Sequence, residues 1–251
     1  MDGMQSVART LRALEILAEH QPLGVTELAR RLDLPKATAQ RILVTLAEAG
    51  WIHQTEAEVT RWRLTPRAFS VAQRASEETN IREAAREHLV ELGKATNETV
   101  HLSLLDRRRG CTVLIDRVDC EQPIRTWKPL GTVGIMHTTS TGLAILSRLP
   151  DKDLDEVIGA GLDRLTERTV TDPDVLKADL AEIRSRGYSV NHGRNRPDIC
   201  AIGAPILDTS GYPVAATCIT MPAFRFDPDR QEEWGAAVAK AAAAISGRVS
   251  L

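Results

Sequence analysis

The stretch VTELARRLDLPKATAQRILVTLAEAG, residues 25–50, decides the fold of the N-terminal part of the chain. Thr26 can cap a first helix by accepting from a free backbone N–H, and residues 33–35 form a tight turn. A second helix starts near Lys36, and Gly50 ends it. Four apolar residues at helical spacing predict its buried face: Ala39, Ile42, Leu43 and Leu46. Two helices joined by a short turn are typical of a helix-turn-helix.

The opposite face of the second helix is polar. Its residues are Lys36, Ala37, Thr38, Gln40 and Arg41. The major groove of DNA admits a helix, whose N-terminal residues then meet the base edges. Glutamine can pair with adenine, arginine can pair with guanine or a phosphate, and lysine and threonine suit phosphates. We therefore expect these five residues and Thr26 to contact DNA, although an ordinary helical hairpin with a solvated polar face would show the same pattern.

The flanks of this stretch extend the pattern. Residues 5–20 predict a helix with an apolar stripe, made of Val7, Leu11, Leu14 and Ala18. Residues 51–54 and 61–64 predict two short strands around an acidic turn, and such a wing would bring Arg61 and Arg63 to the DNA backbone. The sequence thus predicts a winged helix-turn-helix domain over residues 1–65 and a helical connector over 66–80.

The charge of the chain is an argument against DNA binding. The 251 residues carry a net charge of −2, and residues 1–65 contain eight basic and eight acidic residues. The usual basic excess of a nucleic-acid-binding protein is absent. Basic charge is concentrated over residues 30–41, where Arg30, Arg31, Lys36 and Arg41 outnumber Asp33. A dimer would present this small patch twice, but the neutral charge also leaves open a protein-interaction module.

Other classes of protein have little support in the sequence. The four cysteines form no zinc motif and no Cys-x-x-Cys pair, so we expect reduced thiols and no metal or cofactor. No apolar run approaches the ~20 residues of a membrane span, and no signal peptide precedes the first helix. We therefore expect a cytoplasmic protein that does not bind membranes.

Residues 81–251 predict a second domain of strands and helices. After a helix over 81–95, alternating strands are expected at 99–105 and 111–118, with a third at 123–127. A loop then leads to a helix that starts near Thr138 or Thr139. Further helices are expected at 151–159, 173–186 and 227–247, and further strands at 188–191, 199–207 and 213–221. An antiparallel sheet flanked by helices follows, so the fold class of the whole chain is α+β.

The helix start near residue 138 is the first candidate ligand site. Thr138, Thr139, Ser140 and Thr141 stand there, and a helix N-terminus favours an anion. Simple capping by serine or threonine explains the same residues equally well. His137 precedes them without a visible catalytic partner, so a structural or pocket-lining histidine is favoured over a catalytic base.

Nearly the whole chain resembles the IclR-type transcription regulators. The matching N-terminal stretches are SVARTLRALEIL, TELARRLDLPKATAQRIL, LAEAGWI and RWRLTP, and the matching C-terminal stretches are NETVHLSLLD, IRTWKPLG, HTTSTGLAIL, RGYSVN and GAPILDTSGYPVAATCIT. The resemblance implies a winged helix-turn-helix that binds a double-stranded DNA operator, a GAF-like domain that binds a small effector, and a homodimer or tetramer. The first helix and the connector would contribute to dimerisation.

The resemblance also implies effector-binding residues. Backbone groups at Ser140 and Thr141 would bind a carboxylate, and further contacts would come from Asn191, Ala201, Cys218 and Thr220. The chain departs from the family at residues 191–194, where acidic residues are typical, and it has Asp198 in place of a glycine and Ala201 in place of a cysteine. Negative charge is lost and Arg194 is gained, which suits a carboxylate effector, although a loop arginine commonly points into solvent. Met136 and His137, beside the helix start, complete the candidate set.

These features predict a ligand-responsive regulator that is not an enzyme. Effector binding would move the two DNA-binding domains of a dimer and change operator affinity by a coupling free energy of ~1–3 kcal/mol. An enzyme that acts on a small carboxylate through the second domain is an alternative, although no catalytic motif supports it. The sequence leaves repressor and activator equally open.

Overall fold

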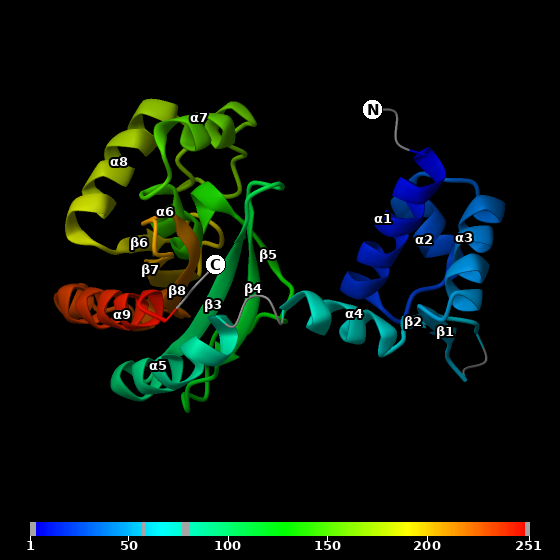
Figure 1. Ribbon diagram of the computed structural model, residues 1–251, viewed down its shortest axis with the longest axis horizontal. Helices are drawn as coiled ribbons and strands as arrows, with labels where there is room; N and C mark the ends of the chain where they lie inside the picture. The colour runs from blue at the N-terminus through cyan, green and yellow to red at the C-terminus, as the bar shows by residue number, and fades with distance from the viewer. Residues whose placement is uncertain (1–3, 57–58, 77–80, 249–251) are drawn as a thin grey trace. The chain divides into compact units, whose positions relative to one another are not determined.

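The computed structural model describes residues 4–56, 59–76 and 81–248, which form two compact units, residues 1–78 and 79–251 (Figure 1). Within the described residues, no helix is both long enough and apolar enough to cross a bilayer. The connector predicted over 66–80 is helical in α4 (Arg67–Ser76), and residues 77–80 lie outside the described residues.

Unit 1 has the winged helix-turn-helix arrangement. Its elements are α1 (Gln5–His20), α2 (Val25–Leu32), α3 (Lys36–Glu48), β1 (Ile52–Gln54), β2 (Trp62–Leu64) and α4. Asp33 ends α2 in the left-handed conformation with φ 52°, which makes the turn into α3 tight. Leu23 and Trp62 exchange two backbone hydrogen bonds of 3.1 and 2.9 Å, so the wing is tied to the segment before α2.

One apolar core holds unit 1 together. The predicted buried face of α3 is confirmed, since all four of its residues are buried. Its core partners come from every other part of the unit up to β2, namely Ala13, Ile16, Leu17, Leu23, Leu28, Ile52 and Trp62. Burial of such side chains, at about 1.5–3 kcal/mol each, stabilises a unit whose helices are short.

Two details of unit 1 differ from the sequence-based expectation. Thr26 does not cap α2: Gly24 is the N-cap, and Thr26 is an exposed residue of the first helical turn. The stripe predicted on α1 is not its buried face either, because Val7 and Leu11 are 50% and 57% exposed. Residues 13, 16 and 17 form a second apolar stripe at helical spacing, and that stripe packs on the core.

Unit 2 is built on one antiparallel sheet. Its six described strands follow the order β5-β4-β3-β8-β7-β6, with bounds β3 (Thr99–Asp106), β4 (Cys111–Val118), β5 (Val133–Ile135), β6 (Ser189–His192), β7 (Ile199–Leu207) and β8 (Pro213–Pro222). The helices α5 (Ile81–Thr96) and α9 (Gln231–Ser246) lie side by side on one face (Figure 1). The other face is covered by α6 (Ser140–Leu146), with α8 (Pro173–Arg186) packed on α6 and α7 (Asp151–Gly159) beside them. Single turns of 3-10 helix, η1 (Met136–Thr138), η2 (Ala223–Arg225) and η3 (Pro228–Arg230), connect these elements.

The α+β fold predicted for the chain is confirmed, with one strand misplaced. Residues 123–127 are not a strand, and the third strand beside β4 is β5, which pairs with residues 111–113. Pro123 lacks the N–H that a sheet ladder needs. Thr126 is instead attached to the sheet by its side chain, whose hydroxyl donates to the carbonyl of Thr220 at 3.2 Å. Residues 119–132 therefore form a long loop, which we name the pocket loop.

Candidate functional site

The exposed face of α3 is the candidate DNA-binding surface of unit 1. Lys36, Ala37, Gln40 and Arg41 are exposed, and Thr38 is half-buried. Among the described residues, neither Lys36 nor Arg41 forms an ion pair, so both charges are free for a phosphate or a base edge. The buried residues of the same helix fix the face that points outward. The predicted set thus lies together on one surface, apart from Thr26 on α2.

The wing carries two further arginines. Arg63 is exposed at the middle of β2, opposite His53 on β1. Arg61 is also exposed, but its guanidinium donates to the carbonyl of Pro22 at 3.2 Å, which ties it to the segment before α2. Arg63 is therefore the better placed of the two to contact a DNA backbone.

The candidate effector site is a cavity between the sheet of unit 2 and the start of α6. Its volume is about 70 Å³, and it is open to solvent. Strands, the pocket loop, the start of α6 and the loop after β6 all contribute to its lining: His101, Ser103, Thr112, Leu114, Lys128, Thr132, Gly134, Thr139, Ser140, Thr141, Asn191, Asn195, Arg196, Ile199, Ala201, Cys218 and Thr220. No aspartate or glutamate belongs to this lining.

The register of the sheet explains why these residues meet. Successive side chains of a strand point to opposite faces, so residues paired across strands share a face. Asn191 lies opposite Ala201, and Ala201 lies opposite Thr220. Cys218 lies opposite His101. Four residues predicted on three separated strands, together with His101, are therefore neighbours on the α6 side of the sheet.

The start of α6 is held close to the sheet. Thr139 caps the helix by accepting from the N–H of Gly142 at 3.1 Å, as the capping interpretation predicts. The hydroxyl of Ser189 donates to the carbonyl of Ser140 at 2.7 Å, and Gly203 leaves room for that carbonyl, since a Cβ there would lie 2.9 Å from its oxygen. This close approach places Ser140 and Thr141 in the cavity lining.

Positive charge in the cavity comes from residues that the sequence did not single out. Lys128 reaches the lining from the pocket loop, and Arg196 from the loop after β6. Burial lowers the pKa of Lys128, and the positive charge of Arg196 adds to this lowering. Arg196 pairs with Asp198 at 3.0 Å, and both side chains are more than half exposed. The environment of Lys128 thus disfavours its own charge, and a bound anion would restore it.

His101 is the second unexpected residue of the site. It is 5% exposed, and its Nε2 has no hydrogen-bond partner among the described residues. Burial, with smaller contributions from Lys128 and Arg117, lowers the pKa of His101 to about 3. The ring is therefore neutral at physiological pH and presents a nitrogen whose partner is missing. Its position on a strand of alternating residues was the only signal in the sequence.

Three predicted effector residues do not reach this cavity. Arg194 forms an ion pair with Asp179 of α8 at 2.7 Å, so it points neither into the cavity nor into open solvent. Met136 and His137 line a different surface cavity, beside the β3–β4 turn. The Nε2 of His137 lies 3.0 Å from the carbonyl of Asp163, which supports the structural interpretation of this histidine.

Asn191 lines the cavity, and its side chain also forms hydrogen bonds to two segments of backbone. Its amide donates to the carbonyl of Thr138 at 2.5 Å, and its side-chain oxygen accepts from the N–H of Arg194 at 3.0 Å. It therefore holds the loop after β6 against the segment before α6. The four cysteines are free and buried, and among the described residues no cluster of histidine, cysteine and carboxylate side chains is suited to a metal ion.

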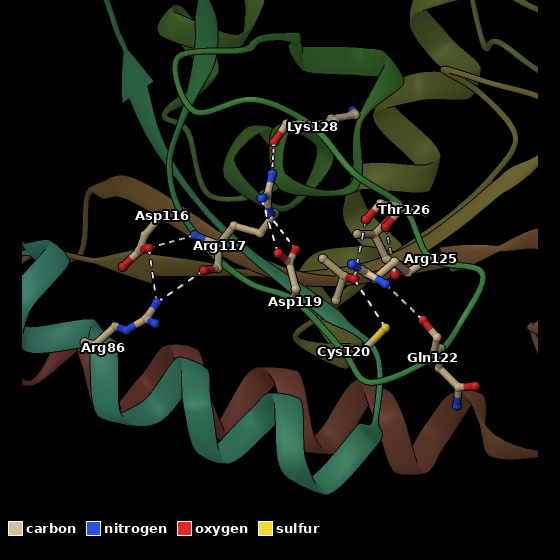
Figure 2. A network of polar contacts seen from close by, with 11 residues as sticks. Arg86, Asp116, Arg117, Asp119, Cys120, Gln122, Arg125, Thr126 and Lys128 are labelled. Atoms are coloured by element: carbon tan, nitrogen blue, oxygen red, sulfur yellow. Dashed lines mark hydrogen bonds and ion pairs between the residues drawn. The ribbon is translucent and has the colours of Figure 1, made fainter.

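A polar network anchors the pocket loop to β4 and α5. Figure 2 shows Arg117 of β4 donating to the carbonyl of Lys128 and pairing with Asp119. The neighbouring Asp116 is buried, and it accepts from the N–H of Arg117 at 2.8 Å and from Arg86 of α5 at 3.2 Å. The backbone that carries Lys128 is therefore linked, through two adjacent residues of one strand, to the first helix of unit 2.

Comparison with known proteins agrees with this architecture. The family model of the IclR helix-turn-helix domain matches residues 6–56, and that of the bacterial transcriptional regulator IclR C-terminal domain matches residues 73–247. The chain belongs to the IclR family of transcription regulators. The predicted resemblance is thereby confirmed, and the chain is a DNA-binding transcription regulator with a ligand-binding C-terminal domain.

Individual relatives cover almost the whole chain. The acetate operon repressor of Salmonella typhimurium is 33% identical over 97% of this chain and 89% of its own length. The HTH-type transcriptional regulator BhcR of Paracoccus denitrificans is 32% identical over 97% of this chain and 87% of its own. The crystal structure of IclR from Thermotoga maritima superposes with a TM-score of 0.76 at 31% identity, over 98% of this chain and 99% of that one.

Proposed function

We propose that this IclR-family protein is an effector-controlled regulator that binds a near-palindromic operator and a small anionic effector, as a homodimer or tetramer. The observation that carries the effector class is the charge of the cavity: Lys128 and Arg196 line it, and no acidic residue does. A carboxylate would neutralise this excess and accept hydrogen bonds from the threonine and serine hydroxyls around it.

Operator binding would use the exposed face of α3. Gln40 and Arg41 are its candidates for reading bases, and Lys36, Thr38 and Arg63 its candidates for phosphates. A two-fold symmetric dimer presents two such helices, so half-sites would be related by the same symmetry and spaced by whole turns of DNA. The exposed Val7 and Leu11 of α1 give that unit an apolar surface that a second copy would cover.

Communication between the two sites would start at the pocket loop. An anion that attracts the side chain of Lys128 would displace the Lys128 carbonyl, which accepts from Arg117. The displacement would pass from Arg117 to Asp116, and from Asp116 to Arg86 of α5. We expect Asp116→Asn to bind effector and operator but to lose most of the coupling between them. Operator affinity measured with and without effector tests this, and an unchanged ratio would contradict the route.

The first test of the function is to recover genomic DNA fragments bound by the full-length protein at several salt concentrations. A shared near-palindromic site, bound more weakly as salt rises, is expected because phosphate contacts release counterions. The recovered operator then serves to screen small carboxylates against their amides for a change in affinity. No enriched site at low salt, with or without carboxylates, would refute the regulator, and turnover of a carboxylate by the pure protein would favour an enzyme.

A further inference from the structure

A second cavity of unit 2, which we name the turn cavity, lies beside the turn between β3 and β4. Its walls are formed by residues 107–110 of that turn, η1, α7 and Tyr212. Its volume is about 310 Å³, against about 70 Å³ for the effector cavity, and the two cavities share no lining residue. Small-molecule sites in proteins commonly occupy about 300–1,000 Å³, so the turn cavity has room for a ligand of its own.

The inner wall of the turn cavity is apolar. Met136 of η1 and Leu149, which precedes α7, are 1% and 3% exposed, and Leu105 of β3 and Val157 of α7 are half-buried beside them. All four side chains belong to, or pack against, the apolar cluster that α6, α7 and α8 share, so their positions are fixed. A ligand with a hydrocarbon part would remove apolar surface from water on both sides of this contact.

The exposed edge of the turn cavity carries three consecutive arginines. Residues 107–109 form the turn between β3 and β4, and all three are exposed. The carboxylate of Asp106 accepts from the N–H of Arg109 at 3.1 Å, and Gly110 completes the turn with φ 59°. A Cβ at Gly110 would lie 3.9 Å from the side chain of Val157, so the turn lies against α7. The arginines therefore project from a backbone of defined shape.

One acidic residue of this lining is already neutralised. Asp153 accepts from the guanidinium of Arg107 at 3.0 Å and from the hydroxyl of Tyr212 at 2.7 Å. Burial, together with the hydrogen bond to Asp153, raises the pKa of Tyr212 to about 12, so this hydroxyl remains a donor. The same guanidinium lies over the Tyr212 ring, 4.9 Å from its centroid. These three side chains satisfy one another and leave the binding of a ligand to their neighbours.

The other two arginines of the turn have no such partner. Among the described residues, neither Arg108 nor Arg109 forms an ion pair within 4.0 Å. The remaining acidic residue of the described lining, Glu156 of α7, is exposed. Two guanidinium groups on one turn can bind a carboxylate by charge-assisted hydrogen bonds, and they outnumber the single carboxylate of Glu156. The turn cavity thus combines an apolar wall with an edge of net positive charge.

We propose that the turn cavity is a second ligand site, which takes an amphipathic organic anion. Its carboxylate would bind Arg108 and Arg109, and its hydrocarbon chain would lie against Met136, Leu149 and Val157. The proposal goes beyond the proposed function and does not rest on it, because none of these residues lines the effector cavity.

The test compares four probes on the full-length protein, whose dissociation constants are measured by isothermal titration calorimetry. Hexanoate carries both parts of the proposed ligand, hexanamide lacks the charge, acetate lacks the chain, and hexylammonium reverses the charge. We expect hexanoate to bind at least tenfold more tightly than each of the other three. If any of these three binds as tightly as hexanoate, the proposed combination of charge and chain is wrong.

Matched variants test the contribution of the two arginines. The double change Arg108→Gln and Arg109→Gln removes two exposed charges and should weaken hexanoate binding at least tenfold, to the level of hexanamide. The control is Lys94→Gln with Lys240→Gln, which removes the same charge from exposed positions on α5 and α9, on the other face of the sheet. The control should leave hexanoate binding unchanged. An equal loss of affinity in both double variants would mean that net charge, and not this site, attracts the anion.

A methionine signal locates the ligand independently of the arginines. The chain has four methionines, of which Met136 lines the turn cavity. In NMR spectra of protein with isotope-labelled methionine methyl groups, hexanoate should shift the Met136 signal, which Met136→Leu identifies. The shift should disappear in the double arginine variant at the same hexanoate concentration. If hexanoate leaves the Met136 signal unchanged, or loses its affinity in Lys128→Gln but not in the arginine variant, it binds in the effector cavity and the proposal is overturned.

Discussion

Gly142 is the position where one added methyl group should have the largest consequence for the effector site. A Cβ at this residue of α6 would lie 2.5 Å from the Cα of Met136 and 2.7 Å from its carbonyl carbon. Carbon atoms pack at about 3.5 Å, so the backbone must move by roughly 1 Å. Overpacking of a core costs about 1–3 kcal/mol. The atoms in contact here belong to the backbone, which moves less readily than a side chain, so we expect a penalty of about 3 kcal/mol. Alanine has a helix propensity about 1 kcal/mol more favourable than that of glycine, so the free energy of unfolding should fall by about 2 kcal/mol in total.

Differential scanning calorimetry of Gly142→Ala measures this loss. For a unit of the size of residues 79–251, we expect Tm to fall by roughly 4–8 °C, since each kcal/mol shifts it by about 2–4 °C. Gly159→Ala at the end of α7 is the matched control, because nothing lies within 4 Å of a Cβ there. The control should leave Tm unchanged or raise it slightly. A Gly142→Ala protein as stable as the control would refute the close-approach reasoning.

Three further changes test other parts of the structure. Arg225→Met should destabilise the protein by about 3 kcal/mol in urea unfolding, because Glu98, whose side chain is 3% exposed, loses its bidentate partner; a loss below about 0.5 kcal/mol would contradict a buried ion pair. Gln40→Ala should relax base preference at one operator position by about 1–3 kcal/mol, measured on base-substituted operators, and an unchanged preference would exclude this residue from readout. The pKa of His101 is lowered from 6.5 to about 3, so between these values the unfolded chain binds more protons and stability should fall as the pH falls; His101→Gln should flatten that decline, and an equal slope would show that other groups cause it.

Local patterns predicted the elements of both units well. The buried face of α3 was predicted correctly because helical periodicity depends only on residues a few positions apart. The strands β3, β4 and β7 were predicted correctly because the alternation of their residues is equally local. The winged arrangement followed, since the tight turn at Asp33 and the short strands after Gly50 leave the chain few alternatives.

Non-local contacts decided the features that the sequence did not predict. Helix α1 has two apolar stripes, and only packing against α2 and the wing chooses between them. Arg194, in the loop after β6, was a candidate for binding an anion, but it forms an ion pair with Asp179 of α8 instead. Lys128 stood in a loop whose path over the sheet depends on Arg117 and Thr126, so no pattern near residue 128 revealed its place in the cavity.

The self-contained core of unit 1 bears on how such regulators diversify. The buried residues of that cluster all come from residues 13–62, and the two clusters of unit 2 are built from residues 81–245. After a gene duplication, mutations that alter the choice of operator and mutations that alter the choice of metabolite can therefore accumulate without compromising each other's packing. Recombination within the gene segment that encodes the residues after β2 would join the coding sequences of two units that each have their own core. In one step, a regulator could then respond to a different effector while it still binds the same operators.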